Sequence, residues 1–120
     1  MIKQRQRDAA RQMAESRQMG AVPGADVVVT NPIHLALAIQ YKPNEMTAPT
    51  VIAKGRRLVA QEIKKIAEEH DIPVVENVVL AQALYQSTEP SMEVPSEYYK
   101  AVAEILAFVY NLRNKRKQRF

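Results

Sequence analysis

The sequence predicts an α/β domain in which a small mixed four-stranded sheet is covered by helices. Short runs of β-branched and aliphatic residues, mostly bounded by Gly, Pro or Asn, occur at 26–30, 35–41, 50–53 and 72–76. Segments with helical periodicity lie between or after these runs. With 47% hydrophobic and 25% charged residues over 120 positions, the composition is that of one globular domain with a modest core.

The first two strands are predicted from different patterns. Residues 26–30 contain three consecutive valines and end at Asn-Pro, which is typical of a buried strand that stops at a tight turn. Residues 35–41 alternate large apolar side chains with Ala or Gln, and the alanines permit burial on the second face as well. Residues 43–45, Pro-Asn-Glu, predict the turn that leads toward the third strand at 50–53.

A helix is predicted over residues 55–70, between the third and fourth strands. One face of this helix carries the apolar residues Leu58, Val59, Ile63, Ile66 and Ala67. Together with the strands at 50–53 and 72–76 it forms a βαβ unit. We therefore expect those two strands to be parallel and joined by a right-handed crossover.

Two more helices are predicted after the fourth strand. Asn77 is a suitable N-cap for a helix over 78–87. Pro95 opens the last helix, which is expected to run to about residue 112. Its expected buried face consists of Tyr99, Val102, Ala103, Leu106 and Val109. Of the neighbouring Tyr98 and Tyr99, one is expected to pack and the other to be exposed.

The N-terminal segment predicts a helix that protrudes from the domain. Residues 3–19 are rich in Gln, Arg, Ala and Met, which favour helix, yet they present only a narrow apolar seam. Gly20, Pro23 and Gly24 end this helix. We therefore divide the chain into a linker helix at 1–20, an α/β domain at 21–112 and a basic tail at 113–120.

The net charge of +4 is unevenly distributed. Residues 1–19 hold five basic and two acidic residues, and residues 112–120 hold five basic and no acidic ones. Residues 20–111 hold seven basic and eleven acidic residues. Basic ends allow a nucleic-acid-binding module as an alternative function. The acidic middle and the lack of a basic face interleaved with aromatic residues argue against it.

Several classes of chemistry have no support in the composition. The chain has no cysteine, and two histidines do not make a metal site by themselves, so no disulfide, thiol, metal or cofactor chemistry is expected. No apolar run is long enough to span a bilayer, and no secretory signal is visible. We therefore expect the chain to lie in the cytoplasm or to face it.

Asn31-Pro32, at the end of the first predicted strand, is the motif with the most distinctive chemistry. Because Pro32 has no backbone N–H, the usual attack of the next backbone nitrogen on an asparagine side chain is closed. The Asn31 amide nitrogen can instead attack its own backbone carbonyl, form a succinimide and release the Pro32 nitrogen as a new N-terminus. An amide is a poor nucleophile, so this reaction needs a rigid turn that holds a near-attack geometry. His34 is close enough in sequence to take a proton or to polarise the carbonyl, although a turn histidine bonded to backbone is the alternative.

Six segments between Ala21 and about Arg113 carry a family resemblance: residues 27–41, 46–49, 51–55, 72–77, 80–85 and 98–107. They resemble the FlhB/YscU family, the export-apparatus switch proteins of flagella and type III secretion systems, and the flagellar branch looks closest. Residues 27–41 are similar to the NPTH segment of that family. Ile33 stands where the family has threonine, so a hydroxyl that could orient the turn or a water is absent. We expect this difference to affect the rate of cleavage more than its position.

The resemblance implies self-cleavage between Asn31 and Pro32. Asn31 would be the nucleophile, Pro32 the leaving group and His34 a possible assistant, and the two pieces are expected to stay together. The cut would remodel a surface and let the export machine change from rod and hook substrates to filament substrates. Because the step is a single turnover with no external substrate, the chain is not expected to be an enzyme in the ordinary sense.

The resemblance also implies a location and partners. Residues 1–20 would be the linker from a membrane domain, which places this domain at the cytoplasmic face of the bacterial inner membrane. The positive charge of that segment fits this location. The implied partners are export-gate membrane proteins, the hook-length control protein and export substrates or their chaperones, with no nucleic acid. A structural docking domain with an inert Asn-Pro turn remains an alternative.

Overall fold

The computed structural model describes residues 2–32 and 34–118, with side chains described for residues 8–32 and 34–115. The helices are α1 (Ile2–Ala21), α2 (Leu58–Glu69), α3 (Val78–Ser87) and α4 (Tyr99–Gln118). The strands are β1 (Val27–Asn31), β2 (Leu35–Gln40), β3 (Thr50–Arg56), β4 (Val74–Glu76) and β5 (Met92–Glu93). Two short 3₁₀ turns, η1 (Val22–Gly24) and η2 (Ser96–Tyr98), precede β1 and α4.

The strands form one mixed sheet in the order β4-β1-β2-β3-β5. β1 pairs antiparallel with β2, β2 with β3 and β3 with β5, whereas β1 and β4 are parallel. The α/β class and the mixed sheet confirm the prediction, with one strand more than the four expected. The additional strand β5 has only two residues, which is too short for an alternating pattern to be recognised.

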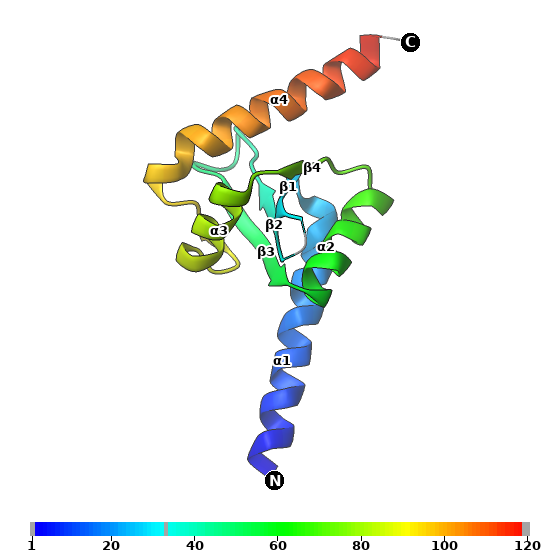
Figure 1. Cartoon of the computed structure of the whole chain (residues 1–120), viewed down its shortest axis with the longest axis vertical. Helices are drawn as coiled ribbons and strands as arrows, with labels where there is room; N and C mark the ends of the chain where they lie inside the picture. Colours follow the sequence, from blue (N-terminus) through cyan, green and yellow to red (C-terminus); the bar gives the residue numbers. More distant parts are fainter. Residues whose placement is uncertain (1, 33, 119–120) are drawn as a thin grey trace.

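Helices cover both faces of the sheet, so the domain has three layers (Figure 1). On one face, Val27 and Val29 pack in a core with the apolar residues of α3 and α4. On the other face, Val28 packs in a second core with the apolar residues of α2. Because successive side chains of a strand point to opposite faces, the three valines of β1 serve both cores. This burial on both faces confirms that β1 is a buried strand.

The connection from β3 through α2 to β4 differs from a simple βαβ unit. β3 and β4 run in the same direction, as expected, but β1 and β2 lie between them. β4 pairs with β1, with Val28 opposite Val74 and Thr30 opposite Glu76. The sequence pattern gave the direction of the two strands, but strand order depends on contacts between distant segments.

α2 begins three residues later than predicted, because β3 continues to Arg56. Gly55 lies in β3 beneath the start of the helix, where an added Cβ would collide with the Val59 side chain. Arg57, with φ of 56°, makes the sharp junction between strand and helix. Leu58 was expected on the buried face but is 78% exposed, and Ala60 is buried instead. The prediction was wrong there because the helix was assumed to start at Gly55.

α4 begins at Tyr99 and not at Pro95 as predicted, because residues 96–98 form the 3₁₀ turn η2, and it presents a narrower buried face. It runs to Gln118, six residues beyond the predicted end. Val102, Leu106 and Val109 are buried as predicted, whereas Tyr99 and Ala103 are exposed on the flank of that stripe. Tyr98 packs against the core and Tyr99 is 38% exposed, which confirms that one tyrosine of the pair packs.

α1 projects away from the sheet along the long axis of the molecule (Figure 1). Its C-terminal end contacts the fold through Met19, which packs against the second core, and through Gln18. None of the helices in the described part of the chain is both long and apolar enough to cross a membrane.

Candidate functional site

Asn31 and Pro32 lie in the tight connection between β1 and β2. Asn31 is the last residue of β1 and is opposite Leu35, the first residue of β2. The His34 backbone N–H donates to the Asn31 carbonyl oxygen at 3.0 Å and closes the turn. Ile33 lies outside the described residues. The carbonyl that self-cleavage would attack therefore already accepts a hydrogen bond.

Two donors from the α2 region hold the other side of the turn. The Lys64 ammonium donates to the Pro32 carbonyl oxygen at 2.7 Å. The Arg57 backbone N–H donates to the His34 carbonyl oxygen at 3.1 Å. Each described carbonyl group of the turn thus accepts a hydrogen bond. One donor belongs to the turn itself, and the other two belong to residues more than twenty positions away in the sequence.

The strand before the turn is firmly held. Thr30 is only 3% exposed, and its carbonyl oxygen accepts from the Asn77 backbone N–H at 2.9 Å. The Asn77 side chain in turn accepts from the Leu80 N–H at 3.1 Å, which confirms Asn77 as the N-cap of α3. Because β1 also pairs with β2 and β4 on its two sides, Asn31 extends from a fixed segment.

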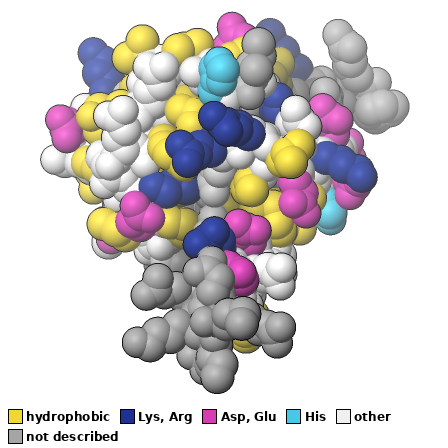
Figure 2. All heavy atoms as spheres, turned by 60° about the horizontal axis from the view of Figure 1, so that its bottom comes forward, with side chains coloured by type: hydrophobic (Ala, Val, Ile, Leu, Met, Phe, Trp, Pro, Cys, Tyr) yellow, Lys and Arg dark blue, Asp and Glu magenta, His cyan; other side chains and the backbone are white. Residues whose placement is uncertain are grey.

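A cavity of about 460 Å³ opens beside the turn. Its lining comes from the turn, from the end of β3 and from α3: Asn31, His34, Leu35, Arg56, Arg57, Gln82, Tyr85 and Gln86. Asn31 is half-buried, whereas Pro32 and His34 are exposed. Lys and Arg side chains gather near the middle of the face in Figure 2, below a histidine. Asn31 therefore borders a polar space that water or a partner can enter.

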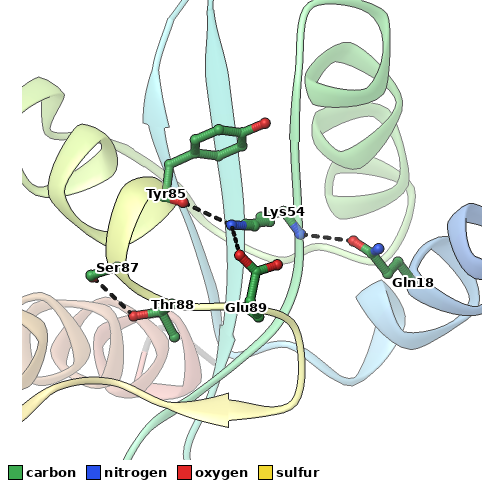
Figure 3. Close-up of polar contacts among 6 residues, drawn as sticks. All are labelled: Gln18, Lys54, Tyr85, Ser87, Thr88 and Glu89. Atoms are coloured by element: carbon green, nitrogen blue, oxygen red, sulfur yellow. Dashed lines mark hydrogen bonds and ion pairs between the residues drawn. The ribbon is translucent and has the colours of Figure 1, made fainter.

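A lysine on β3 connects this region to α1 and α3 (Figure 3). The Lys54 ammonium donates to the Tyr85 carbonyl oxygen at 2.7 Å and pairs with Glu89 at 3.1 Å. It also lies 4.6 Å from the centre of the Tyr85 ring. The Lys54 backbone N–H donates to the Gln18 side chain at 3.2 Å. Lys54 thus fixes Tyr85, which lines the cavity, and attaches the end of α1 to β3.

A second concave surface has a different character. A groove of about 370 Å³ lies between α4 and the segment that joins β2 to β3. Its lining is mostly apolar: Tyr41, Thr47, Pro49, Tyr99, Ala103, Leu106, Ala107 and Tyr110. No asparagine, histidine or charged group lines it, so the polar cavity at the turn is the candidate site for chemistry.

The structure brings Asn31, Pro32 and His34 together in one turn, as the sequence predicted. The role of the His34 imidazole and the effect of Ile33 both stay predictions. Lys64 and Arg57 were missed as contacts of the turn, because no local pattern connects α2 with residues 31–34. In the described residues, no group of three or more His, Cys, Asp or Glu is arranged to hold a metal ion. The expectation that cleavage needs no metal also stays a prediction.

Comparison with known proteins gives a family and close relatives. Residues 1–109 match the model of the FlhB HrpN YscU SpaS family. The chain is 50% identical over 114 residues to the flagellar biosynthetic protein FlhB of Bacillus subtilis, covering 95% of this chain and 31% of that protein. It is 45% identical over 115 residues to FlhB of Salmonella typhimurium, covering 96% and 30%. The chain therefore spans about a third of the length of these relatives.

Solved structures resemble the chain as well. The cytoplasmic domain of FlhB from Shewanella putrefaciens superposes with a TM-score of 0.83 and 41% identity, covering 88% of this chain and 81% of that one. A mutated EscU C-terminal domain superposes with a TM-score of 0.74 and 30% identity, covering 77% and 92%. These likenesses confirm the predicted α/β fold.

Proposed function

This chain belongs to the FlhB HrpN YscU SpaS family, and from that premise we propose that it cuts itself between Asn31 and Pro32 as part of a flagellar protein-export component. The observation that carries the proposal is the closed turn in which the Asn31 carbonyl accepts from the His34 N–H. In this proposal the cut changes the class of substrate that the export machine accepts.

The reaction needs only the atoms of Asn31 and Pro32. A bond forms between the Asn31 side-chain nitrogen and the Asn31 backbone carbon, and the bond from that carbon to the Pro32 nitrogen breaks. One proton leaves the side-chain nitrogen and one arrives on the Pro32 nitrogen, so water and ammonia are neither consumed nor released. The products are a C-terminal succinimide and a new N-terminal proline.

The geometry of the turn favours this reaction in two ways. The His34 N–H is positioned to stabilise the negative charge that develops on the Asn31 carbonyl oxygen during attack. The hydrogen bonds to the carbonyl groups of Thr30, Pro32 and His34 restrict the backbone, which helps a weak nucleophile to stay near its target. We propose that the His34 imidazole assists by accepting the proton from the side-chain nitrogen.

Structures of substituted relatives support the choice of these three residue types. Solved EscU C-terminal domains carry substitutions of an asparagine, of the proline that follows it and of a histidine two residues beyond that proline. Asn31, Pro32 and His34 have this spacing. The FlhB relatives are flagellar biosynthetic proteins, and this supports a flagellar role for the present chain.

The cut would act locally. It produces pieces of 31 and 89 residues that together make the 120 of the whole chain. The piece that contains β1 keeps its pairing with β2 and β4, so the freed residues are those of the turn. We propose that this remodelled surface is what export-gate membrane proteins, the hook-length control protein and export substrates or chaperones distinguish.

The location follows from the same premise. The FlhB structure that superposes on this chain is named as a cytoplasmic domain, and the curated FlhB proteins are about three times as long as this chain. α1 projects from the sheet, as a linker to another domain would (Figure 1). We propose that the domain lies at the cytoplasmic face of the bacterial inner membrane, joined through α1 to a membrane domain.

The test is the intact mass of the denatured chain, measured for the parent and for Asn31→Ala. The parent is expected to give two fragments that separate between Asn31 and Pro32 and whose masses sum to that of the uncut chain. A sum larger by one water means that the succinimide has opened or that a hydrolase made the cut. The Asn31→Ala variant should remain uncut, because the nucleophile is removed. A parent chain that stays uncut on long incubation would favour an inert docking domain instead.

A further inference from the structure

We propose that Lys64 is a positioning residue for the self-cleavage, because it holds Pro32 before the cut and helps to release it afterwards. The inference rests on the proposed self-cleavage. It concerns a residue on α2 that is 32 positions from Pro32 in the sequence. Neither half of this role is visible from the sequence around the Asn-Pro motif.

The first step of the argument is the position of Lys64 itself. α2 is fixed against the sheet by the buried residues Ala60, Ile63 and Ala67. Lys64 follows Ile63 and is half-buried, and its ammonium reaches the solvent-exposed turn. The ammonium lies 2.7 Å from the Pro32 carbonyl oxygen. A hydrogen bond from a charged donor at this distance is stronger than one between neutral groups.

The second step is the part that the Pro32 carbonyl plays in the geometry of cleavage. The proline ring already fixes φ of the leaving residue. A donor on its carbonyl oxygen restricts ψ as well, so the leaving residue is held in one orientation relative to the rest of the turn. The Arg57 N–H, which holds the His34 carbonyl, restrains the far side of the turn. Lys64 therefore restricts the remaining backbone freedom of the leaving group.

The third step is the change of charge at the cut. Before cleavage the Pro32 nitrogen is a neutral amide. Afterwards it is a secondary amine that takes up a proton from solvent and becomes cationic. It then lies within the same residue as the carbonyl that the Lys64 ammonium contacts, and two positive charges at such short range repel each other. The Lys64 ammonium, which stabilises the position of Pro32 before the cut, thus destabilises that position after the cut.

The test measures the cleavage rate of four variants against the parent. Each chain is translated in vitro, sampled over time into urea and scored by intact mass. We expect Lys64→Gln to slow the cut by about tenfold or more, because a small misplacement of reacting groups has an effect of this order. Lys64→Arg, which keeps a charged donor, should restore most of the rate. Lys65→Gln is the matched control, since it removes the same charge from an exposed neighbour on α2.

A fourth variant and a melting curve show whether misfolding, and not the loss of the ammonium, explains a slower cut. Lys64→Met removes the ammonium but keeps an unbranched apolar stem, so it should slow the cut as Lys64→Gln does while the melting temperature stays at the parent value. Cleavage of both variants at the parent rate would overturn the role of Lys64 and leave the self-cleavage intact. Equal slowing by Lys65→Gln would also overturn it, because net charge would then be the cause. A parent chain that never cuts would overturn the proposed function itself, and this inference with it.

The release half of the proposal has its own readout. In protein that has been allowed to cut completely, backbone amide exchange at residues 34–36 should be faster in the parent than in Lys64→Gln, since the variant lacks the repulsion. In uncut Asn31→Ala protein, adding Lys64→Gln should have the opposite effect and speed exchange, because the contact is lost. Equal exchange in the two cut proteins would rule out the release role.

Discussion

In the proposed self-cleavage Asn31 provides both the nucleophile and the attacked carbonyl, so its surroundings would decide whether the chain cuts. Asn31 is half-buried beside a polar cavity, and its carbonyl accepts from the His34 N–H. This hydrogen bond comes from the backbone, so it survives any replacement of the His34 side chain except proline. The backbone and side-chain contributions of His34 can therefore be separated by mutation.

His34→Ala is expected to slow self-cleavage by about a hundredfold but not to abolish it. Loss of a proton acceptor has an effect of this order, while the donor to the Asn31 carbonyl remains. The measurement is the rate at which uncut chain disappears by intact mass. His70→Ala is the control, because His70 lies at the C-terminal end of α2, where its ring contacts the Ile66 carbonyl oxygen. An unchanged rate in His34→Ala would mean that solvent takes the proton.

At the scale of elements, α3 and α2 hold the turn from its two sides. The N-terminal end of α3 binds the Thr30 carbonyl through Asn77, and α2 binds the Pro32 carbonyl through Lys64. Lys54 fixes the C-terminal end of α3 through the Tyr85 carbonyl. The rigidity that the proposed self-cleavage needs would therefore come from helices that are distant in sequence.

Asn77→Ala is expected to lower the free energy of unfolding by about 1 kcal/mol, because the N-cap of α3 loses its side-chain acceptor. Chemical denaturation of the uncut Asn31→Ala background measures this without interference from cleavage. Asn111→Ala, at an exposed position within α4, is the matched control and should change stability by only a few tenths of a kcal/mol. Equal effects of the two changes would contradict the role of Asn77 as a cap.

At the scale of the whole molecule, the sheet explains why one broken bond need not separate the pieces. β1 lies inside the sheet, between β2 and β4, and its three valines are fully buried. Each such side chain contributes on the order of 1.5–3 kcal/mol. None of these contacts depends on the peptide bond between Asn31 and Pro32.

We expect the pieces of 31 and 89 residues to elute together at the position of the uncut Asn31→Ala chain in size-exclusion chromatography. Urea should then separate them into two species by mass. Separate elution without denaturant would show that the strand depends on the intact turn, contrary to its pairing on both sides.

The main elements of this fold could be predicted because their signals are local. The valine run of β1, the alternation of β2 and the Asn77 cap each lie within a few residues and were predicted close to their observed bounds. The start of α2 was predicted wrongly because Gly55, judged only from its neighbours in the sequence, was taken as the first residue of the helix. Its actual role depends on how closely Val59 approaches the strand, which the sequence does not show.

The sequence by itself determined the α/β class, the positions of the long elements and the Asn31-Pro32-His34 motif, since each depends on residue type and short-range spacing. Only the tertiary structure decided the order β4-β1-β2-β3-β5 and placed Lys64 on Pro32 and Arg57 on His34. The physical reason is that strand order and contacts between α2 and the turn depend on packing between distant segments. A sequence pattern can predict which face of a helix is buried. Only the folded chain shows which carbonyl oxygen a lysine on that helix reaches.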